Sequence, residues 1–135
     1  MKQAYVLDAN AVLDFLESNS GSERIERLFQ ESRDQRAMLL ISVVNWGEVF
    51  YHVWQRHGEE SARRSLASLS RIPMELVPVD EQQAFQAGEI KVLHKIPYVD
   101  SLAAALAVLR RATLVTSDRD FEKLGRRAPI LWIRR

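Results

Sequence analysis

The sequence contains no cysteine among its 135 residues. This absence excludes a disulfide scaffold, a zinc site with thiolate ligands and a cysteine nucleophile, and it fits a reducing compartment. No apolar run approaches the roughly 20 residues of a membrane span. The N-terminal residues Met-Lys-Gln-Ala-Tyr-Val-Leu-Asp include no apolar region long enough for a signal peptide. We therefore expect a soluble, cytoplasmic protein with no membrane partner.

The chain also lacks an excess of charge of one sign. Its 19 lysines and arginines nearly balance 18 aspartates and glutamates, which leaves a formal net charge of +1. A polybasic nucleic-acid-binding chain is therefore excluded, and any attraction to a polyanion must come from local patches. There is no linker, repeat or low-complexity segment. With 47% apolar residues, the length suits one domain with its own core, and we expect residues 1–135 to form it.

Short apolar segments alternate along the chain with segments of helical periodicity. Five segments predict strands: residues 4–7, 38–42, 75–79, 113–116 and 130–133. The clearest helix runs from Asn45 to His57 and is stopped by Gly58. Pro78 favours an edge position for the third strand. The alternation predicts an α/β fold, in which a roughly five-stranded, mainly parallel sheet is flanked by helices on both faces.

Several local features are predicted from residue spacing. Ser20 with Glu23 matches a capping box, and Asp80 with Gln83 matches a second helix start. Trp46, Phe50 and Trp54 match the spacing of a buried helix face. An alternative is that part of this apolar stripe stays exposed and receives a partner helix. The three histidines are too scattered for a metal site, so we expect them to be surface or packing residues.

Four acidic residues are placed where a parallel sheet would gather them. Asp8 ends the first predicted strand and Asp118 follows the fourth, while Glu48 and Asp100 are expected in the first turns of helices. Ligands of open parallel sheets bind outside the carboxyl ends of the strands, so we expect these four side chains to converge. Asp14 and Asp120 are candidates to join them from the periphery.

Converging carboxylates need cations or shared protons, because two unit charges about 4 Å apart repel by about 4 kcal/mol at an effective dielectric near 20. Oxygen ligands of this kind suit Mg²⁺ or Mn²⁺. Such ions activate water and stabilise the leaving oxygen in phosphoryl transfer, so the pattern favours a nuclease. Each acid also has a simpler interpretation: Asp8 in an Asx-turn, Asp100 and Asp118 as helix caps, and Glu48 as part of a capping pair with Asn45.

Four motifs together resemble those of a known family. They are Asp-Ala-Asn at residues 8–10, Glu48 in the helix after the second strand, residues 97–105 around Asp100, and Thr-Ser-Asp-Arg-Asp-Phe at residues 116–121. The pattern resembles a PIN domain, most closely the short toxin ribonucleases of the VapC type, over nearly the whole chain. One departure is Ala9, which stands where the family usually carries a hydroxyl.

The resemblance implies an endoribonuclease that cleaves RNA by metal-activated water and uses Mg²⁺ or Mn²⁺. It implies that four residues are catalytic metal ligands: Asp8, Glu48, Asp100 and Asp118. It also implies four supporting residues around them: Asn10, Thr116, Ser117 and Asp120. Asp120 is alternatively a cap of the final helix. The implied partners are a tRNA or rRNA substrate, a cognate antitoxin whose peptide covers the site, and a second copy of the chain in a homodimer.

Other interpretations stay open at this stage. The chain could be a PIN-like RNA-processing nuclease without an antitoxin, or a catalytically silent PIN-like interaction module. A phosphoacceptor receiver domain is disfavoured because no lysine follows the last predicted strand. Arginine recurs in pairs that are either a solvated surface or contacts for an RNA backbone. The pairs are Arg63-Arg64, Arg110-Arg111, Arg126-Arg127 and Arg134-Arg135.

Overall fold

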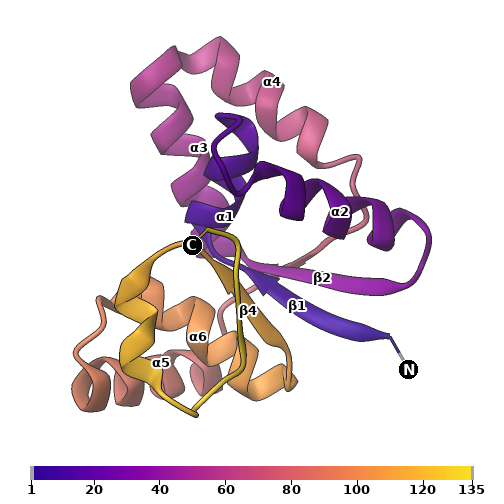
Figure 1. Cartoon of the computed structure of the whole chain (residues 1–135). Helices are drawn as coiled ribbons and strands as arrows, with labels where there is room; N and C mark the ends of the chain where they lie inside the picture. The colour runs from indigo at the N-terminus through magenta and orange to yellow at the C-terminus, as the bar shows by residue number, and fades with distance from the viewer. Residues whose placement is uncertain (1, 135) are drawn as a thin grey trace.

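The computed structural model describes residues 2–134 and contains a five-stranded sheet in the order β3-β2-β1-β4-β5 (Figure 1). Every strand pair is parallel. The strands are β1 (Gln3–Leu7), β2 (Ala37–Ser42), β3 (Glu75–Val77), β4 (Thr113–Thr116) and β5 (Ile130–Trp132). The helices are α1 (Ala9–Leu16), α2 (Ser22–Arg33), α3 (Val43–His57), α4 (Glu59–Leu69), α5 (Glu81–His94), α6 (Tyr98–Arg110) and the 3₁₀ helix η1 (Arg119–Leu124). The predicted α/β fold with helices on both faces is confirmed.

The central strand β1 is paired with strands from both halves of the chain. Its Tyr5 lies in register with Leu39 of β2 on one side and with Thr113 of β4 on the other. The chain therefore builds outward from β1 to β3 and then returns to add β4 and β5 on the opposite side. The reversal places a topological switch point at the carboxyl ends of β1 and β4, where open parallel sheets bind ligands. β3 is an edge strand, as Pro78 predicts.

Alternating side chains of the strands supply two hydrophobic cores, one on each face of the sheet. Val6, Leu40 and Leu114 pack with α5, α6 and η1, whereas Leu7, Ile41 and Val115 pack with α1 to α4. Figure 1 shows these two groups of helices on opposite sides of the strands. Residues 101–107 of α6 are all buried, and four of them are alanine, so this helix can lie close against the sheet. The close packing fixes the position of Asp100 in its first turn.

Local sequence signals were accurate at some helix ends and wrong at others. Asp80 caps α5 by accepting a hydrogen bond from the Gln83 backbone N–H at 2.8 Å. Gly58 ends α3 with a φ of +91°, a conformation that glycine adopts without strain. The predicted capping box of Ser20 and Glu23 is wrong, because α2 begins after Gly21 without a side-chain cap. A Cβ at Gly21 would lie 2.9 Å from the Ile133 side chain, so close packing dictates the residue there.

The apolar stripe of α3 is only partly buried. Val49 and Val53 are in the core, Trp46 and Phe50 are half-buried, and Trp54 is 42% exposed. The prediction that Trp54 belongs to the core is therefore wrong. The Trp54 ring packs edge-to-face on Phe50, with 5.5 Å between the ring centroids. This contact covers part of the indole, and the side chain remains partly exposed to solvent.

Within residues 2–134 no single helix is long and apolar enough to cross a membrane, although α5 and α6 together, bent by 115°, pass a test of length and composition.

Candidate functional site

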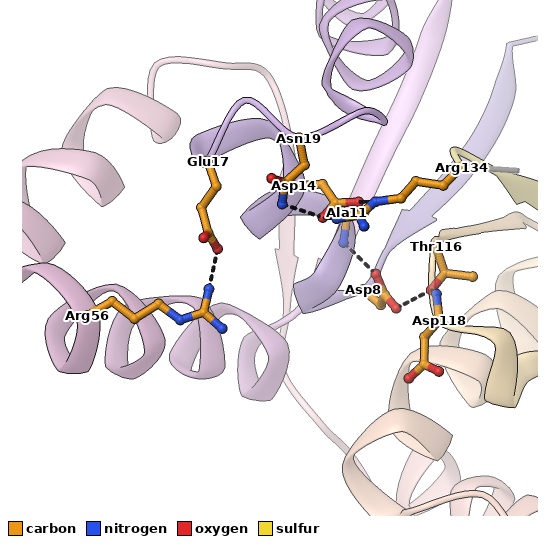
Figure 2. Close-up of polar contacts among 9 residues, drawn as sticks. All are labelled: Asp8, Ala11, Asp14, Glu17, Asn19, Arg56, Thr116, Asp118 and Arg134. Carbon is orange, nitrogen blue, oxygen red and sulfur yellow. Dashed lines mark hydrogen bonds and ion pairs between the residues drawn. The ribbon is translucent and has the colours of Figure 1, made fainter.

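Asp8 lies at the carboxyl end of β1 and is almost fully buried. One carboxylate oxygen accepts the Ala11 backbone N–H at 2.8 Å, so the residue is the N-cap of α1, whereas its simpler interpretation was an Asx-turn. The other oxygen accepts the Thr116 hydroxyl at 2.5 Å (Figure 2). Thr116 is itself fully buried at the end of β4. This pair therefore joins the two strands at the switch point.

Asp118 is tied to the same hydroxyl. Its backbone N–H donates to the Thr116 Oγ1 at 2.9 Å, and its own carboxylate accepts the Asp120 backbone N–H at 2.9 Å to cap η1. Thr116 thus donates to one acidic residue and accepts from the next. Its hydroxyl therefore lies between the two acidic residues and contacts both.

Three carboxylates form a compact group beside this pair. Asp100, Asp118 and Asp120 each offer one oxygen, and the three oxygens lie within 4.8 Å of one another. Asp100 projects from the first turn of α6 and Asp118 from the loop after β4. Asp120 is exposed, and its carboxylate belongs to this group, although the sequence predicted only a peripheral position for it. Its spacing two residues after Asp118, with the backbone turned by the cap, brings it into the group.

Glu48 reaches the site from α3, in the second turn rather than the expected first, because α3 begins two residues earlier than predicted. Ser42 is the N-cap, so the predicted capping role of Asn45 is wrong. The pairing of Asn45 with Glu48 is nevertheless real, since the Asn45 Nδ2 donates to the Glu48 Oε1 at 2.8 Å. Asn45 is 1% exposed, and its Oδ1 is buried without a hydrogen-bond partner.

The pKa values show that the acids share one electrostatic environment. Burial raises the pKa of Asp8 to about 7, although the hydrogen bonds from Thr116 and Ala11 oppose the rise, and the charges of Asp100 and Asp118 add to it. Burial also raises the pKa of Asp100 to about 6, with further contributions from Asp118, Glu48 and Asp120. Perturbed carboxyl groups of this kind cluster at functional sites. The structure therefore brings the four expected acids, with Asp120, to one edge of the sheet.

The residues present fit a hard divalent cation. The group of Asp100, Asp118 and Asp120 offers only carboxylate oxygens, the ligands that Mg²⁺ and Mn²⁺ prefer. The raised pKa values of Asp8 and Asp100 mean that, without a cation, these carboxyls keep their protons up to about pH 7 and about pH 6. A bound cation would replace these protons.

Other residues considered in the sequence lie outside this group. The prediction that Asp14 joins the acidic site from its periphery is wrong. Its carboxylate accepts hydrogen bonds from the Asn19 Nδ2 at 3.1 Å and from the Arg134 Nε at 2.8 Å, as Figure 2 shows. The pairing occurs because α1 turns Asp14 toward the loop before α2 and toward the segment after β5. Asn10 is exposed on the first turn of α1, and Ser117 is half-buried beside Asp118.

The arginine pairs are mostly engaged in ion pairs. Arg63 and Arg64 pair with Glu59 and Glu60 on α4. Three further ion pairs involve Arg110 with Glu75, Arg127 with Glu89, and Arg134 with Asp14. Arg111 and Arg126 are exposed. Arg135 lies outside the described residues.

Comparison with known proteins relates this arrangement to one family. The PIN domain profile matches residues 5–127. None of the curated proteins matches the sequence. Similar solved structures include VapBC2 from Rickettsia felis bound to a DNA fragment from its promoter, with a TM-score of 0.74, 20% identity and coverage of 96% of this chain and 98% of that one.

Two other solved structures are similar over almost their whole length. DNA-bound VapBC from Salmonella typhimurium has a TM-score of 0.73 at 22% identity, covering 99% of this chain and 100% of that one. VapC20 from Mycobacterium tuberculosis, a toxin that cleaves the sarcin-ricin loop, has a TM-score of 0.72 at 18% identity, covering 90% and 95%. At these identities the structures show that the fold is shared. The sequence profile spans most of the chain, and the chain belongs to the PIN domain family.

Proposed function

We propose that this chain is a metal-dependent endoribonuclease that acts as the toxin of a toxin–antitoxin pair in the cytoplasm. The observation that carries the proposal is the cluster of carboxylates at the switch point of the sheet, with the raised pKa values of Asp8 and Asp100. VapC20, which shares the fold, is described as cleaving the sarcin-ricin loop. The RNA class that we propose as substrate is accordingly tRNA or rRNA.

The proposed ligands of Mg²⁺ or Mn²⁺ are Asp8, Glu48, Asp100 and Asp118. When bound, such a cation activates water for attack on a phosphodiester and neutralises charge on the phosphate. The chain's own residues orient the ligands: Thr116 holds the Asp8 Oδ2, and Asn45 holds the Glu48 Oε1. Asp120 adds a further carboxylate beside Asp100 and Asp118, at the exposed side of the cluster. Asn10 and Ser117 are proposed to support the site from its rim.

Two protein partners belong to the proposal. An antitoxin is supported by the relatives that were solved as VapBC complexes. A cleft of about 230 Å³ between α1, α3 and α4 offers a place for a helix of such a partner, because Leu13, Leu16 and Val53 give it an apolar part among polar lining residues. A homodimer is supported by apolar side chains exposed on α5, where Phe85 is 72% exposed and Val92 is 75% exposed.

Cleavage of purified RNA tests the catalytic part of the proposal. Antitoxin-free protein should cut total cellular RNA into discrete fragments with Mg²⁺ or Mn²⁺ and should be inactive in EDTA. Asp100→Asn should reduce the rate by at least about 100-fold while leaving the thermal unfolding curve cooperative. Asp34→Asn, which removes an exposed carboxylate far from the site in sequence and at the end of α2, is the matched control. Cleavage by Asp100→Asn at the control rate would contradict the assignment.

The alternatives give different results in the same assay. A PIN-like processing nuclease without an antitoxin would cleave RNA, yet its expression in cells would not arrest growth. A silent interaction module would neither cleave RNA nor bind Mn²⁺ in calorimetry.

A further inference from the structure

Two clefts lie beside the edge strand β5 and share one lining residue, Trp132. Trp132 lines a cleft of about 450 Å³ together with Arg24, Arg27 and Arg134. It also lines a cleft of about 540 Å³ together with Arg126. We call the surface formed by Trp132, Arg24, Arg27 and Arg126 the β5 edge surface. Both clefts adjoin β5, and the Trp132 side chain packs against the core on the side of α6 and η1.

The cations of the β5 edge surface are available for an anionic ligand. Arg24 and Arg27 are exposed and stand three residues apart on α2, so they share one helix face. The Arg24 Nη1 donates to the Trp132 backbone carbonyl at 2.9 Å, which anchors this guanidinium at strand β5. Among the ion pairs of residues 2–134, none involves Arg24, Arg27 or Arg126.

Acidic residues do not cancel this positive charge. Glu23 and Glu122 also line the two clefts. Glu122, however, is paired with Arg119 at 3.4 Å. Glu31 lines a neighbouring cleft together with Arg24 and Arg27. The three cations of the β5 edge surface therefore face two carboxylates, Glu23 and Glu31, that have no partner among the described ion pairs. The surface has a local positive excess although the whole chain is almost neutral.

Arg119 links this surface to the acidic cluster. Its guanidinium carbon lies 4.4 Å from the centroid of the Trp132 ring. The same guanidinium donates to the Arg134 carbonyl at 3.1 Å. In sequence Arg119 stands between Asp118 and Asp120, two members of the carboxylate group. A polymer held against Trp132 thus lies next to the candidate catalytic centre.

We propose that the β5 edge surface binds single-stranded RNA, with backbone phosphates at Arg24, Arg27 and Arg126 and a base stacked against the Arg119–Trp132 pair. The inference rests on the proposed ribonuclease function and adds the path of its substrate. A cluster of carboxylates repels a phosphodiester, so the substrate must be retained by cations nearby. Positive charge combined with a planar aromatic and guanidinium surface is the arrangement that holds single-stranded nucleic acid. An acidic peptide would use the charge but not the stacking plane.

Equilibrium binding separates this surface from catalysis. The Asp100→Asn protein is titrated into a 12-nucleotide, 5′-fluorescein-labelled single-stranded RNA, and fluorescence anisotropy gives the dissociation constant at several salt concentrations. Adding Arg24→Ala with Arg27→Ala should weaken binding at least about tenfold at low salt and lower the salt slope by about 1.4, as expected for two lost phosphate contacts on a single strand. Trp132→Leu should weaken binding about fivefold or more, because it removes the stacking plane.

The matched control is Arg63→Ala with Arg64→Ala in the same background. It also removes two positive charges, but from α4, where both arginines are already paired. Its dissociation constant should stay within about twofold of the parent. Equal weakening by the two double variants, or no weakening by Arg24→Ala with Arg27→Ala, overturns the proposal. Displacement of the RNA by polyglutamate as readily as by unlabelled polyuridine also overturns it, in favour of an acidic protein partner.

Failure of this inference can be distinguished from failure of the proposed function. If the unmutated protein cleaves RNA and the Arg24→Ala, Arg27→Ala variant binds normally, the surface is wrong and the nuclease stands. If the protein does not cleave RNA but the variant loses binding, the surface stands and the catalytic proposal fails.

Discussion

The Asn45 side chain holds Glu48 in place, with 2.8 Å between the Asn45 Nδ2 and the Glu48 Oε1. The orientation leaves the Asn45 Oδ1 buried without a partner, at a cost of about 1–3 kcal/mol for an unsatisfied polar atom. A fixed amide of this kind is useful where the direction of a carboxylate matters more than stability. We therefore expect Asn45 to position a proposed metal ligand by acting through Glu48.

Asn45→Ala should weaken Mn²⁺ binding by about 10- to 100-fold, the range typical for loss of a group that orients a ligand. The free energy of unfolding should change by no more than about 1 kcal/mol, because the substitution also removes the unpaired Oδ1. Calorimetric titration with Mn²⁺ and urea denaturation measure the two quantities. Gln82→Ala, which removes an exposed amide from α5, is the control. Unchanged affinity together with a large loss of stability would show that Asn45 is only structural.

The stability of the metal-free protein should depend on pH in a direction set by Asp8 and Asp100. In the folded protein these carboxyls keep protons up to pH values of about 7 and about 6, whereas the unfolded chain releases them near the ordinary value of 3.8. Between these limits the folded state binds more protons than the unfolded state. The free energy of unfolding in EDTA should therefore fall as the pH rises from about 4 to about 7.

Asp8→Asn should remove much of this pH dependence. At pH 8 in EDTA the substitution should raise the free energy of unfolding by about 2–4 kcal/mol, because a buried charge is no longer formed. Saturating Mn²⁺ should stabilise the unmutated protein at pH 8 and have less effect on Asp8→Asn. Urea denaturation at pH 5 and pH 8 measures both effects. A stability that rises with pH in EDTA would contradict the assigned pKa values.

Asp14 should behave differently from the acids of the cluster. Asp14→Asn breaks the ion pair with Arg134 and should lower the free energy of unfolding by about 1.5–3 kcal/mol, the contribution of a hydrogen bond to a charged group. Mn²⁺ affinity should stay within about twofold, because the carboxylate is held by Arg134 and lies outside the group of Asp100, Asp118 and Asp120. Thermal unfolding and calorimetry test these effects, and a tenfold loss of affinity would place Asp14 in the site.

The exposed face of α5 should mediate self-association. Phe85→Asp with Val92→Asp should convert a dimer to a monomer, because two charges would have to be buried in the interface. Light scattering after size-exclusion chromatography measures the mass. Leu76→Asp, on the edge strand β3, is the control for an exposed apolar residue elsewhere. A monomeric mass for the unmutated protein would refute the dimer.

Much of the fold was predictable because strands and helices have different hydrophobic periods. The five strand segments, the helix at α3 and the edge position of β3 follow from local patterns that tertiary packing did not override. The capping box at Ser20 failed because packing between Gly21 and Ile133, more than 100 residues away, decides that turn. The prediction that Trp54 is buried failed because helical spacing identifies the apolar face of a helix but not how far neighbouring elements cover that face.

For the candidate site, the sequence was enough to predict which acidic residues come together. Parallel strands deliver their carboxyl ends to one edge, and this rule brings Asp8 and Asp118 together without any detail of side chains. It does not reveal that Thr116 bridges them, that Asn45 is buried with one unpaired atom, or that Asp120 lies closer than Asp14. These facts depend on side-chain rotamers and loop geometry, which local sequence patterns do not reveal.

The position of β1 affects how the protein folds during its synthesis. Tyr5 of β1 is paired with Thr113 of β4, so the central strand cannot pair on this side until a segment more than 100 residues later has been synthesised. A chain still emerging from the ribosome can pair β1 with β2, yet it has no β4, no Thr116 and no Asp118. Such long-range parallel pairing also folds slowly. The proposed cleavage activity needs residues from both ends of the sequence, so an unfinished chain cannot have it before synthesis has passed residue 118.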